Sequence, residues 1–316
     1  MIVYSETKRQ FVQDVRTNVI ADKILDKVFE KGINAGQDRE FAAWQNSMQF
    51  MRNIMDDKDI DDDVMIAIEY QIPLTSKRVD FVISGADNSN NDNVVIVELK
   101  QWQKAMVVDD EMQYSVKTFV AGTDRIVAHP SYQAYSYAQF IKNYSEHVEK
   151  GKIKIVPCAY LHNFESVYKP QLLDVIYKEW YTLAPFFIKN ETKQFSEFVK
   201  KHVSKKSSNG DVLSAIDGGR IRPNKALQDS LVSMVKGNKE FTLLDEQVVI
   251  FDMCIKTMRQ CKRDGRKRTM IIQGGPGTGK SVLAINLLME FINQQMNASY
   301  VTKNSAPRKA FFVIVV

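Results

Sequence analysis

The chain has 316 residues, a formal net charge of +5 and a hydrophobic content of 44%. This length suggests about two domains, and the composition is that of a globular protein, which excludes a disordered or fibrous chain. The modest positive charge permits a nucleic-acid partner without requiring one.

The cysteines and the apolar segments favour a cytoplasmic location. Three cysteines without CxxC spacing argue against a disulfide framework and against a zinc site. The N-terminus meets charge too early for a signal peptide, and no apolar run approaches the roughly 20 residues of a membrane helix. We therefore expect a cytoplasmic protein with no membrane association.

Hydrophobic periodicity predicts two helices at the start of the chain, over 7–30 and from about Asp38. The acidic segment 56–63 lacks the spacing and the glycine of a calcium-binding EF-hand, so we interpret it as a solvated turn. Alternation and turn residues then predict three strands, a helix that begins at Pro130, and a further strand. Their predicted ranges are 64–71, 78–84, 94–100, 130–144 and 152–161.

The loop between the second and third of these strands places two carboxylates opposite each other. Asp80 lies nine residues before position 89, the midpoint of the loop, and Glu98 lies nine residues after it. A symmetric hairpin puts their Cβ atoms about 5 Å apart, with Lys100 on the same face as Glu98. Like charges in apolar strands require neutralisation, and oxygen ligands favour Mg²⁺ or Mn²⁺. The trio predicts a metal-dependent site; a lysine that merely satisfies two carboxylates is the alternative.

Asp80 followed by Glu98-Leu99-Lys100 resembles the PD-(D/E)xK nuclease superfamily, whose αβββαβ core has the same order as the predicted elements. Gln133 and Tyr137, one helical turn apart, resemble the QxxxY pattern of RecB-like members. The alternative for this helix is that its tyrosines are core residues.

This resemblance implies cleavage of DNA with Mg²⁺ or Mn²⁺ bound by Asp80 and Glu98. Lys100 would orient the attacking water or steady the developing negative charge. The superfamily often adds an acid from the first helix, for which Glu40 is the candidate and Glu69, on the first strand, the rival.

A second motif, a complete phosphate-binding loop, lies near the end of the sequence, between a predicted strand over 269–273 and a predicted helix over 280–294. Glycines let backbone N–H groups turn toward phosphate oxygens. Lys280 is expected to reach the β and γ phosphates of ATP, and Ser281 to bind Mg²⁺. The motif reads Gly274-Gly275-Pro276-Gly277-Thr278-Gly279-Lys280-Ser281.

The segment around this loop, about 222–308, resembles the start of the bacterial Schlafen group-3-like DNA/RNA helicase domain, a superfamily 1 relative. Gln247 resembles the adenine-reading glutamine of helicases, and the strand expected over 299–303 resembles one that contacts single-stranded nucleic acid. The stretch Glu98–Trp102 fits the ELKxW stretch of members that carry an N-terminal nuclease-like region. No Walker B strand, arginine finger or second motor lobe is found, so we expect weak nucleotide binding and negligible ATP hydrolysis.

We therefore expect an α/β protein with a restriction-endonuclease-like core followed by the first βαβ unit of an apparently truncated P-loop NTPase. A Lys- and Ser-rich linker is expected over 200–210, with helices near 225–235 and 245–260. The predicted parts are an N-terminal helical segment (1–36), a nuclease-like domain (37–204), a linker and helix (205–240) and a partial P-loop helicase/ATPase domain (241–316).

The expected function is metal-dependent cleavage of DNA, attached to the start of an ATP-dependent DNA/RNA helicase motor, in a role against foreign DNA. A second interpretation is a nucleic-acid-binding ATPase whose nuclease fold is a silent docking module. A third is a non-enzymatic chain that sequesters DNA or a partner subunit. A cluster of six basic residues within 259–268 fits either a phosphate-contacting surface or a solvated helix end.

Overall fold

The computed structural model describes residues 1–32, 37–73, 75–150, 153–219 and 242–302. The chain divides into two units, and the predicted boundaries after residues 36, 204 and 240 stay predictions. Unit 1 comprises Met1–Met106, Thr118–Arg125 and His129–Arg222, and unit 2 comprises Val107–Lys117, Ile126–Ala128 and Pro223–Val316.

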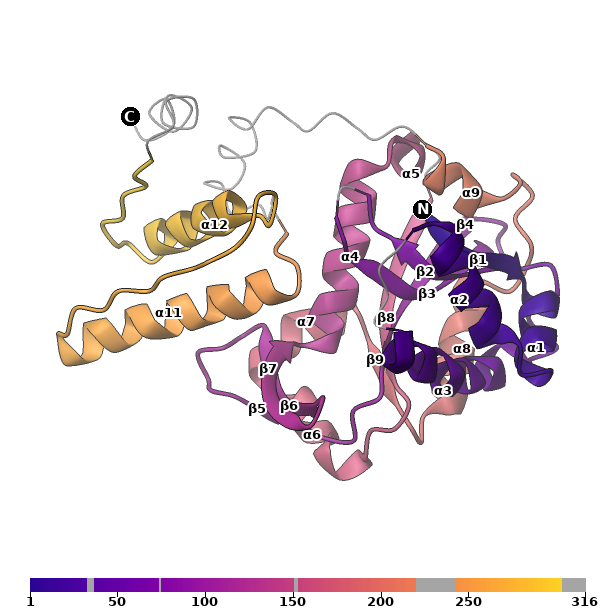
Figure 1. Ribbon diagram of the computed structural model, residues 1–316, viewed down its shortest axis with the longest axis horizontal. Coiled ribbons are helices and arrows are strands. Elements are labelled where there is room, and N and C mark those ends of the chain that lie inside the picture. The colour runs from indigo at the N-terminus through magenta and orange to yellow at the C-terminus, as the bar shows by residue number, and fades with distance from the viewer. Residues whose placement is uncertain (33–36, 74, 151–152, 220–241, 303–316) are drawn as a thin grey trace. The chain divides into compact units, whose positions relative to one another are not determined.

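Unit 1 is built on a six-stranded mixed sheet (Figure 1). Its strands are β1 (Ile2–Thr7), β2 (Met65–Gln71), β3 (Arg78–Ala86), β4 (Asp92–Lys100), β8 (Lys154–Leu161) and β9 (Phe186–Ile188). Their order is β1-β2-β3-β4-β8-β9; the pairs from β1 to β4 are antiparallel, and β8 and β9 are added in parallel. With its helices, this sheet confirms the predicted α/β class.

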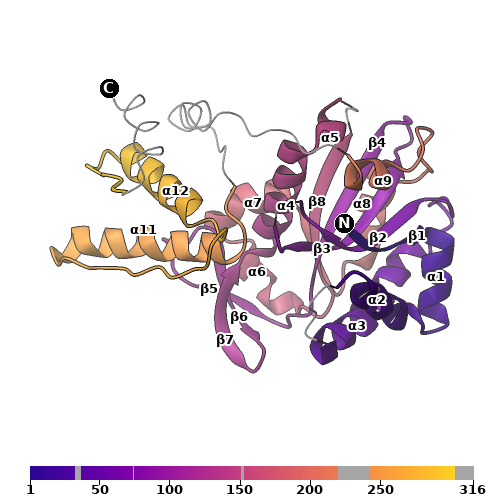
Figure 2. The same cartoon turned by 45° about the horizontal axis from the view of Figure 1, so that its top comes forward.

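Helices cover both faces of this sheet (Figures 1 and 2). One face carries α1 (Lys8–Arg16), α2 (Ile20–Glu30), α3 (Gln37–Met55) and α8 (Thr192–His202). The other face carries α4 (Pro130–Tyr144), which contacts β4 and β8. Shorter helices complete the unit: α5 (Glu146–Lys150), α6 (Lys169–Leu172), α7 (Lys178–Leu183) and α9 (Val212–Asp217).

The main core lies between the sheet and the first group of helices. It contains Phe81 and Ile83 of β3 and Val95 and Val97 of β4, all fully buried. Because successive side chains of a strand point to opposite faces, the even-numbered residues of these two strands face α4. The alternation therefore puts Asp80, Glu98 and Lys100 on the side of the sheet that α4 covers.

The predicted order of helix, three strands, helix and strand is confirmed by α3, β2, β3, β4, α4 and β8. The helix expected over 7–30 is two helices, because Asn18 adopts a left-handed conformation with φ 60° and ends the first one. The strand β1 was not predicted; it is recognisable only through its pairing with β2, more than 55 residues away in sequence.

A three-stranded sheet between β4 and α4 in sequence was also missed. It consists of β5 (Ala105–Val107), β6 (Ser115–Val120) and β7 (Thr123–Ala128), in the order β5-β6-β7. The turn between β6 and β7 has positive φ at Ala121 (53°) and Gly122 (82°). Hairpin turns of this kind usually carry Asn-Gly or Asp-Gly, so an alanine at the first position conceals the signal.

The segment expected as a linker, 200–210, is instead part of the fold of unit 1. Helix α8 continues to His202, and Val203 is fully buried in the main core. The amides of Ser204 and Lys205 both donate to the carbonyl of Ala86, each at 3.0 Å. A composition rich in lysine and serine does not predict such backbone hydrogen bonds, because they depend on a strand that is distant in sequence.

The acidic segment 56–63 is a turn, as expected, but its carbonyls and carboxylates also hold a buried lysine. Lys8 Nζ donates to the carbonyls of Asp57 and Ile60 at 2.7 and 2.6 Å and lies 3.1 Å from an Asp62 carboxylate oxygen. The turn therefore binds the start of α1 in addition to facing solvent.

Unit 2 contains two long helices, α11 (Glu246–Asp264) and α12 (Lys280–Asn293), which confirm two predicted helices. The strand expected over 269–273 is wrong: this stretch forms no ladder with any other described segment, and Ile271 is 82% exposed. A strand needs a partner for its backbone hydrogen bonds, and apolar character alone does not supply one. Residues 299–302 also lack a ladder among the described residues.

The helix expected near 225–235 and the end of the chain after residue 302 lie outside the described residues. None of the helices that are described combines enough length with enough apolar character to cross a membrane.

Candidate active site and phosphate loop

The register of the β3–β4 hairpin confirms the predicted pairing of the two carboxylates. Phe81 pairs with Val97, and Ser84 pairs with Val94, so the next position along places Asp80 opposite Glu98. The hairpin is symmetric about residue 89, as the even spacing of the acids predicted.

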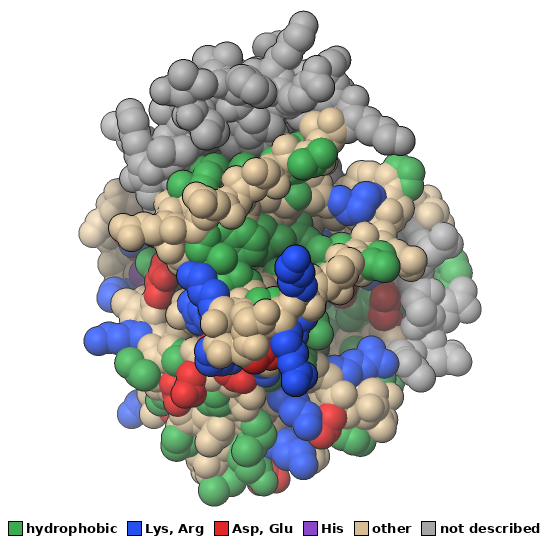
Figure 3. Space-filling view, turned by 90° about the vertical axis from the view of Figure 1, so that its left-hand side faces the viewer, with side chains coloured by type: hydrophobic (Ala, Val, Ile, Leu, Met, Phe, Trp, Pro, Cys, Tyr) green, Lys and Arg blue, Asp and Glu red, His purple; other side chains and the backbone are tan. Residues whose placement is uncertain are grey.

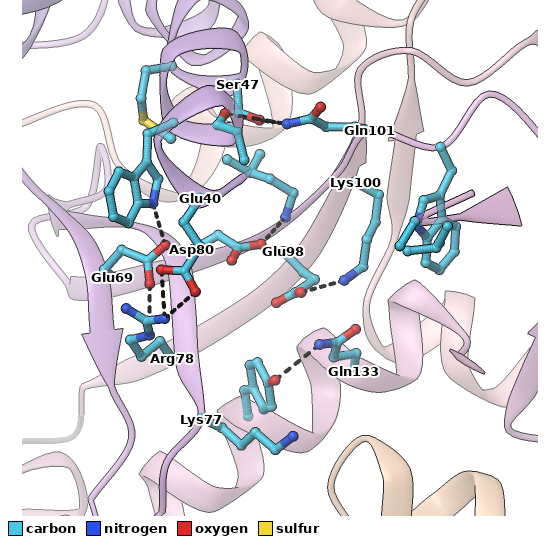
Figure 4. Close-up of a pocket in the computed structure, with 18 of the residues that line it drawn as sticks. Glu40, Ser47, Glu69, Lys77, Arg78, Asp80, Glu98, Lys100, Gln101 and Gln133 are labelled. Carbon is cyan, nitrogen blue, oxygen red and sulfur yellow. Dashed lines mark hydrogen bonds and ion pairs between the residues drawn. The ribbon is translucent and has the colours of Figure 1, made fainter. Parts of the chain in front are cut away.

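A cavity of about 600 Å³ lies in unit 1 over this end of the hairpin (Figure 4). Residues from α3, β2, β3, β4 and α4 line it, together with Phe119 and the turn after it. The structure brings together all the candidate residues of the predicted nuclease site, which are Glu40, Glu69, Asp80, Glu98, Lys100, Gln133 and Tyr137.

Asp80, Glu98 and Lys100 form one contiguous polar group in the cavity. Lys100 Nζ lies 2.7 Å from Glu98 Oε1 and 5.5 Å from the ring centroid of Trp102. The amide of Leu99 donates to Asp80 Oδ2 at 2.7 Å. Burial raises the pKa of Asp80, while the Lys100 charge and the Leu99 amide oppose this rise. The site therefore holds two carboxylates in a poorly hydrated place with one ammonium beside them.

A second polar group, which was not predicted as a unit, is centred on Arg78. Its Nε lies 3.0 Å from Glu69 Oε2, and its Nη2 lies 3.1 and 3.2 Å from the two carboxylate oxygens of Glu40. The indole N–H of Trp44 donates to Glu69 Oε1 at 2.7 Å. The two candidate extra acids, Glu40 and Glu69, are thus held by one guanidinium, whose charge the sequence analysis had not used.

Glu69 has an unusual backbone and an unusual carboxyl. Its φ is 56°, although Ile68 and Tyr70 on either side pair regularly with β3. Left-handed conformations cost side-chain-bearing residues about 1–2 kcal/mol and concentrate at functional sites. Burial raises the pKa of Glu69 to about 7, with a further contribution from the charge of Asp80. The strain and the perturbed pKa both occur at the wall of the cavity.

Gln133 and Tyr137 lie on the face of α4 that lines the cavity. Gln133 Nε2 donates to the Tyr137 hydroxyl at 3.0 Å. The helix begins at Pro130, after His129 caps it by accepting the Ser131 amide at 3.2 Å. The other tyrosines of this helix, Tyr132 and Tyr135, pack on the indole of Trp180 instead. Tyr132 and Tyr137 are buried, as the interpretation as core residues expects, whereas Tyr135 is partly exposed; Tyr137 also lines the cavity.

A hydroxyl and a histidine extend the polar lining behind the cavity. Ser47 Oγ accepts from Gln101 Nε2 at 3.2 Å and lies 3.1 Å from His162 Nε2. His162 is fully buried, stacks on Phe50, and has its pKa lowered by that burial. The sequence carried no signal for this contact, because Ser47 and His162 are isolated residues 115 positions apart.

The pair Asp80 and Glu98 matches what a magnesium ion requires. Mg²⁺ keeps several waters and is usually bound through one or two carboxylates. Within the described parts of the chain, no group of three or more His, Cys, Asp or Glu side chains is arranged to hold a metal ion. A hydrated ion on two carboxylates is therefore the binding mode that these residues fit.

Two glycines of the phosphate-binding motif in unit 2 adopt left-handed conformations. Gly277 and Gly279 have φ of 75° and 78°, so the loop uses its glycines for left-handed turns. Helix α12 begins at Lys280. Lys280 Nζ donates to the carbonyls of Gly274 and Gly275 at 2.7 and 2.6 Å, so the lysine folds over the loop.

Gln247 contacts the phosphate loop, while its predicted role in reading adenine stays a prediction. Its Nε2 donates to the carbonyl of Thr278 at 3.0 Å, and its Oε1 accepts the Leu244 amide at 3.0 Å. A Cβ atom on Gly279 would lie 2.3 Å from Gln247 Nε2, so the end of the Gln247 side chain would have to move, and the φ of 78° by itself favours glycine at this position. Ser281 starts the first turn of α12 and is exposed.

The basic cluster lies at the end of α11 and in the following loop, where Figure 3 shows lysine and arginine side chains with acidic ones among them. Arg263 pairs with Glu111 at 2.5 Å, and Arg268 pairs with Asp264. At least these two cations thus form ion pairs within the protein, while both interpretations of the cluster stay predictions. The cluster comprises Arg259, Lys262, Arg263, Arg266, Lys267 and Arg268.

Comparison with protein families gives a match to part of unit 2. The family model described as Schlafen group 3, DNA/RNA helicase domain, matches residues 267–312, a segment that includes the phosphate loop. No curated protein and no solved structure matches the chain. This part of the chain is therefore similar to a helicase domain.

Proposed function

We propose that this protein is a metal-dependent nuclease joined to the start of a nucleotide-binding helicase motor, and that its substrate is DNA. The observation that carries the nuclease proposal is the convergence of Asp80, Glu98 and Lys100 in one cavity, in register across a hairpin. The similarity of residues 267–312 to a DNA/RNA helicase domain supports nucleic acid as the partner.

Asp80 and Glu98 would hold the ion, and the chemistry that Mg²⁺ supplies when bound is neutralisation of the phosphodiester and activation of water. The Leu99 amide fixes the orientation of the Asp80 carboxyl through its 2.7 Å hydrogen bond. Lys100, held by Glu98 in the resting protein, supplies a positive charge where negative charge develops on the phosphate.

Gln133 and Tyr137 complete the site from the other side. Their mutual hydrogen bond orients the amide and the hydroxyl on one face of α4. Neutral donors of this kind bind backbone phosphates and so position a nucleic acid without reading its sequence. We therefore assign them a positioning role toward the phosphate next to the one that is cleaved.

Nuclease activity is tested with the full chain on linear, circular and single-stranded DNA, with and without Mg²⁺. Glu98→Gln and Lys100→Met should each lower the cleavage rate at least about 100-fold, because each removes one charge from the site. Lys142→Met, at an exposed position of α4, is the matched control and should cleave at the wild-type rate. Full Mg²⁺-dependent cleavage by Glu98→Gln would refute the site.

One observation favours a second function, a non-catalytic module that docks nucleic acid. Two cations of the cavity already form ion pairs within the protein, Lys100 with Glu98 and Arg78 with both Glu40 and Glu69. Binding of DNA in gel-shift assays without cleavage in any metal, and lost at high salt, would favour this alternative.

A further inference from the structure

Four carboxylates line the cavity, and Arg78 divides them into two pairs (Figure 4). Glu40 and Glu69 both contact the guanidinium, at 3.0–3.2 Å. The other pair, Asp80 and Glu98, has Lys100 beside it, at 2.7 Å from Glu98. Each pair of negative charges thus has one permanent organic cation within hydrogen-bonding distance.

The strand register shows how close the two pairs are. Ile68 pairs with Phe81 and Tyr70 with Val79, so Glu69 occupies the position opposite Asp80, which in turn lies opposite Glu98. Three acids therefore occupy one row across β2, β3 and β4. Such a row, with Glu40 above it, has enough carboxylate oxygens for two adjacent divalent ions.

Arg78 contacts the carboxylate oxygens of Glu40 and Glu69, which a second ion would need as ligands. A guanidinium is planar, stays protonated in proteins, and bridges two carboxylates through fixed N–H donors. Its side chain is only 18% exposed, and Trp44 holds Glu69 from the opposite side. The Glu40–Arg78–Glu69 group is therefore a preformed bridge whose cation cannot exchange with solvent ions.

We propose that Arg78 is a resident cation that bridges the carboxylates of Glu40 and Glu69 and thereby restricts the cavity to a single divalent ion, held by Asp80 and Glu98. This inference rests on the proposed function, because it assumes that those two acids bind a metal. It assigns Arg78 a positioning role and removes Glu40 and Glu69 from the set of direct metal ligands.

The test counts the Mn²⁺ ions that the full chain binds. Electron paramagnetic resonance measures free Mn²⁺, and the bound ions are the difference from the total added. Nucleotide is left out so that the phosphate loop holds no ligand. The reference for other sites is the Asp80→Asn/Glu98→Gln double variant. Wild-type protein should bind one ion more than this reference. Arg78→Gln should bind one ion more than wild type, and that extra ion should be lost when Glu69→Gln is added.

A second variant keeps the test decisive if Arg78→Gln does not fold. Glu40→Gln/Glu69→Gln should bind the same number of ions as wild type, and loss of the ion in this variant would overturn the inference. Two ions above the reference in wild type, or an unchanged count in folded Arg78→Gln, would overturn it as well while leaving the nuclease proposal intact. No ion above the reference in wild type would overturn the metal site itself and this inference with it.

Discussion

Two buried carboxyl groups of this protein have pKa values of about 7, one in each unit. In unit 1 it is Glu69, at the wall of the cavity, and in unit 2 it is Asp252, on α11. Asp252 is 1% exposed and accepts from the Ser115 hydroxyl at 2.7 Å and from the Tyr114 amide at 3.0 Å. In both cases burial is the largest cause of the rise, since a charged carboxylate is poorly solvated there.

The group around Asp252 explains how residues 107–117 belong to unit 2. Besides the bonds to Asp252, Lys256 pairs with Asp109 at 2.7 Å, and the ring of Tyr114 meets Phe251 edge-on. These contacts join a segment between β5 and β6 to a helix that lies about 140 residues later in the sequence. A buried acid, rather than an apolar patch, is at the centre of this association.

Asp252→Asn should remove a pH dependence from the stability of unit 2. Between its ordinary pKa of 3.8 and its folded value of about 7, the native carboxyl keeps a proton that the unfolded chain has released. Because the native state binds more protons than the unfolded state in this window, the free energy of unfolding falls as pH rises, by at most about 1.4 kcal/mol per pH unit. The asparagine variant should therefore gain stability relative to wild type from pH 4 to pH 7, measured by urea unfolding at each pH.

Asp110→Asn, at an exposed position of the same segment, is the control and should follow the wild-type curve. A constant difference between Asp252→Asn and wild type across this range would show that burial does not hold the proton on Asp252.

At the scale of elements, the residues that follow α8 pair with the end of β3. Ala86 forms an isolated antiparallel bridge with Lys205, and its amide donates to the Lys205 carbonyl at 2.7 Å. Gly85 is the residue that permits this approach. A Cβ atom there would lie 2.4 Å from the Lys205 carbonyl oxygen and 2.8 Å from Val203 Cγ1.

Gly85→Ala should therefore destabilise unit 1 by about 2–3 kcal/mol, because a backbone oxygen cannot rotate away as a side chain could. Chemical denaturation monitored by tryptophan fluorescence would measure the loss. Gly122→Asn is the control: its site is open and has φ of 82°, which asparagine tolerates, so less than about 1 kcal/mol should be lost. Equal stability of Gly85→Ala and wild type would mean that residues 203–205 do not pack against the end of β3.

At the scale of the whole molecule, two candidate ligand sites belong to different units. The carboxylate cavity is lined by residues of unit 1 alone, and the phosphate loop with Gln247 belongs to unit 2. Each site is complete within its own unit as far as the described residues show. A ligand specific for one site should therefore slow hydrogen exchange in a different part of the chain from a ligand specific for the other site.

Hydrogen exchange measured by mass spectrometry tests this separation. MgATP should slow exchange over 274–281 and at the start of α12, because loop amides and the helix N-terminus would bind phosphate oxygens. Mn²⁺ without nucleotide should slow exchange in the β3–β4 hairpin. Lys280→Ala should lose the first effect and keep the second. Because Mg²⁺ alone should also protect the hairpin, the reference for MgATP is protein with the same Mg²⁺ and no nucleotide, and further protection of both regions by ATP over this reference would contradict two separate sites.

Much of the proposed active site could be predicted because its signals are local. The symmetric spacing of Asp80 and Glu98 about one loop determines their pairing, and Gln133 and Tyr137 share a helix face through their spacing alone. Arg78 could not be predicted as a partner of Glu40, since the two are 38 residues apart on different elements. The same limit applies to Ser47 with His162 and to the positive φ of Glu69.

The sequence by itself determined the long helices, the central hairpin, the phosphate loop and the identity of the acids, since each depends on residues within about one element of one another. Only the tertiary structure decided that β1 joins the sheet, that residues 203–205 pack on β3, that 269–273 forms no ladder with the segments the structure describes, and that one arginine holds two of the four acids. The physical reason is that these features depend on hydrogen bonds and ion pairs between distant segments, and periodicity or composition within a segment does not specify its partner.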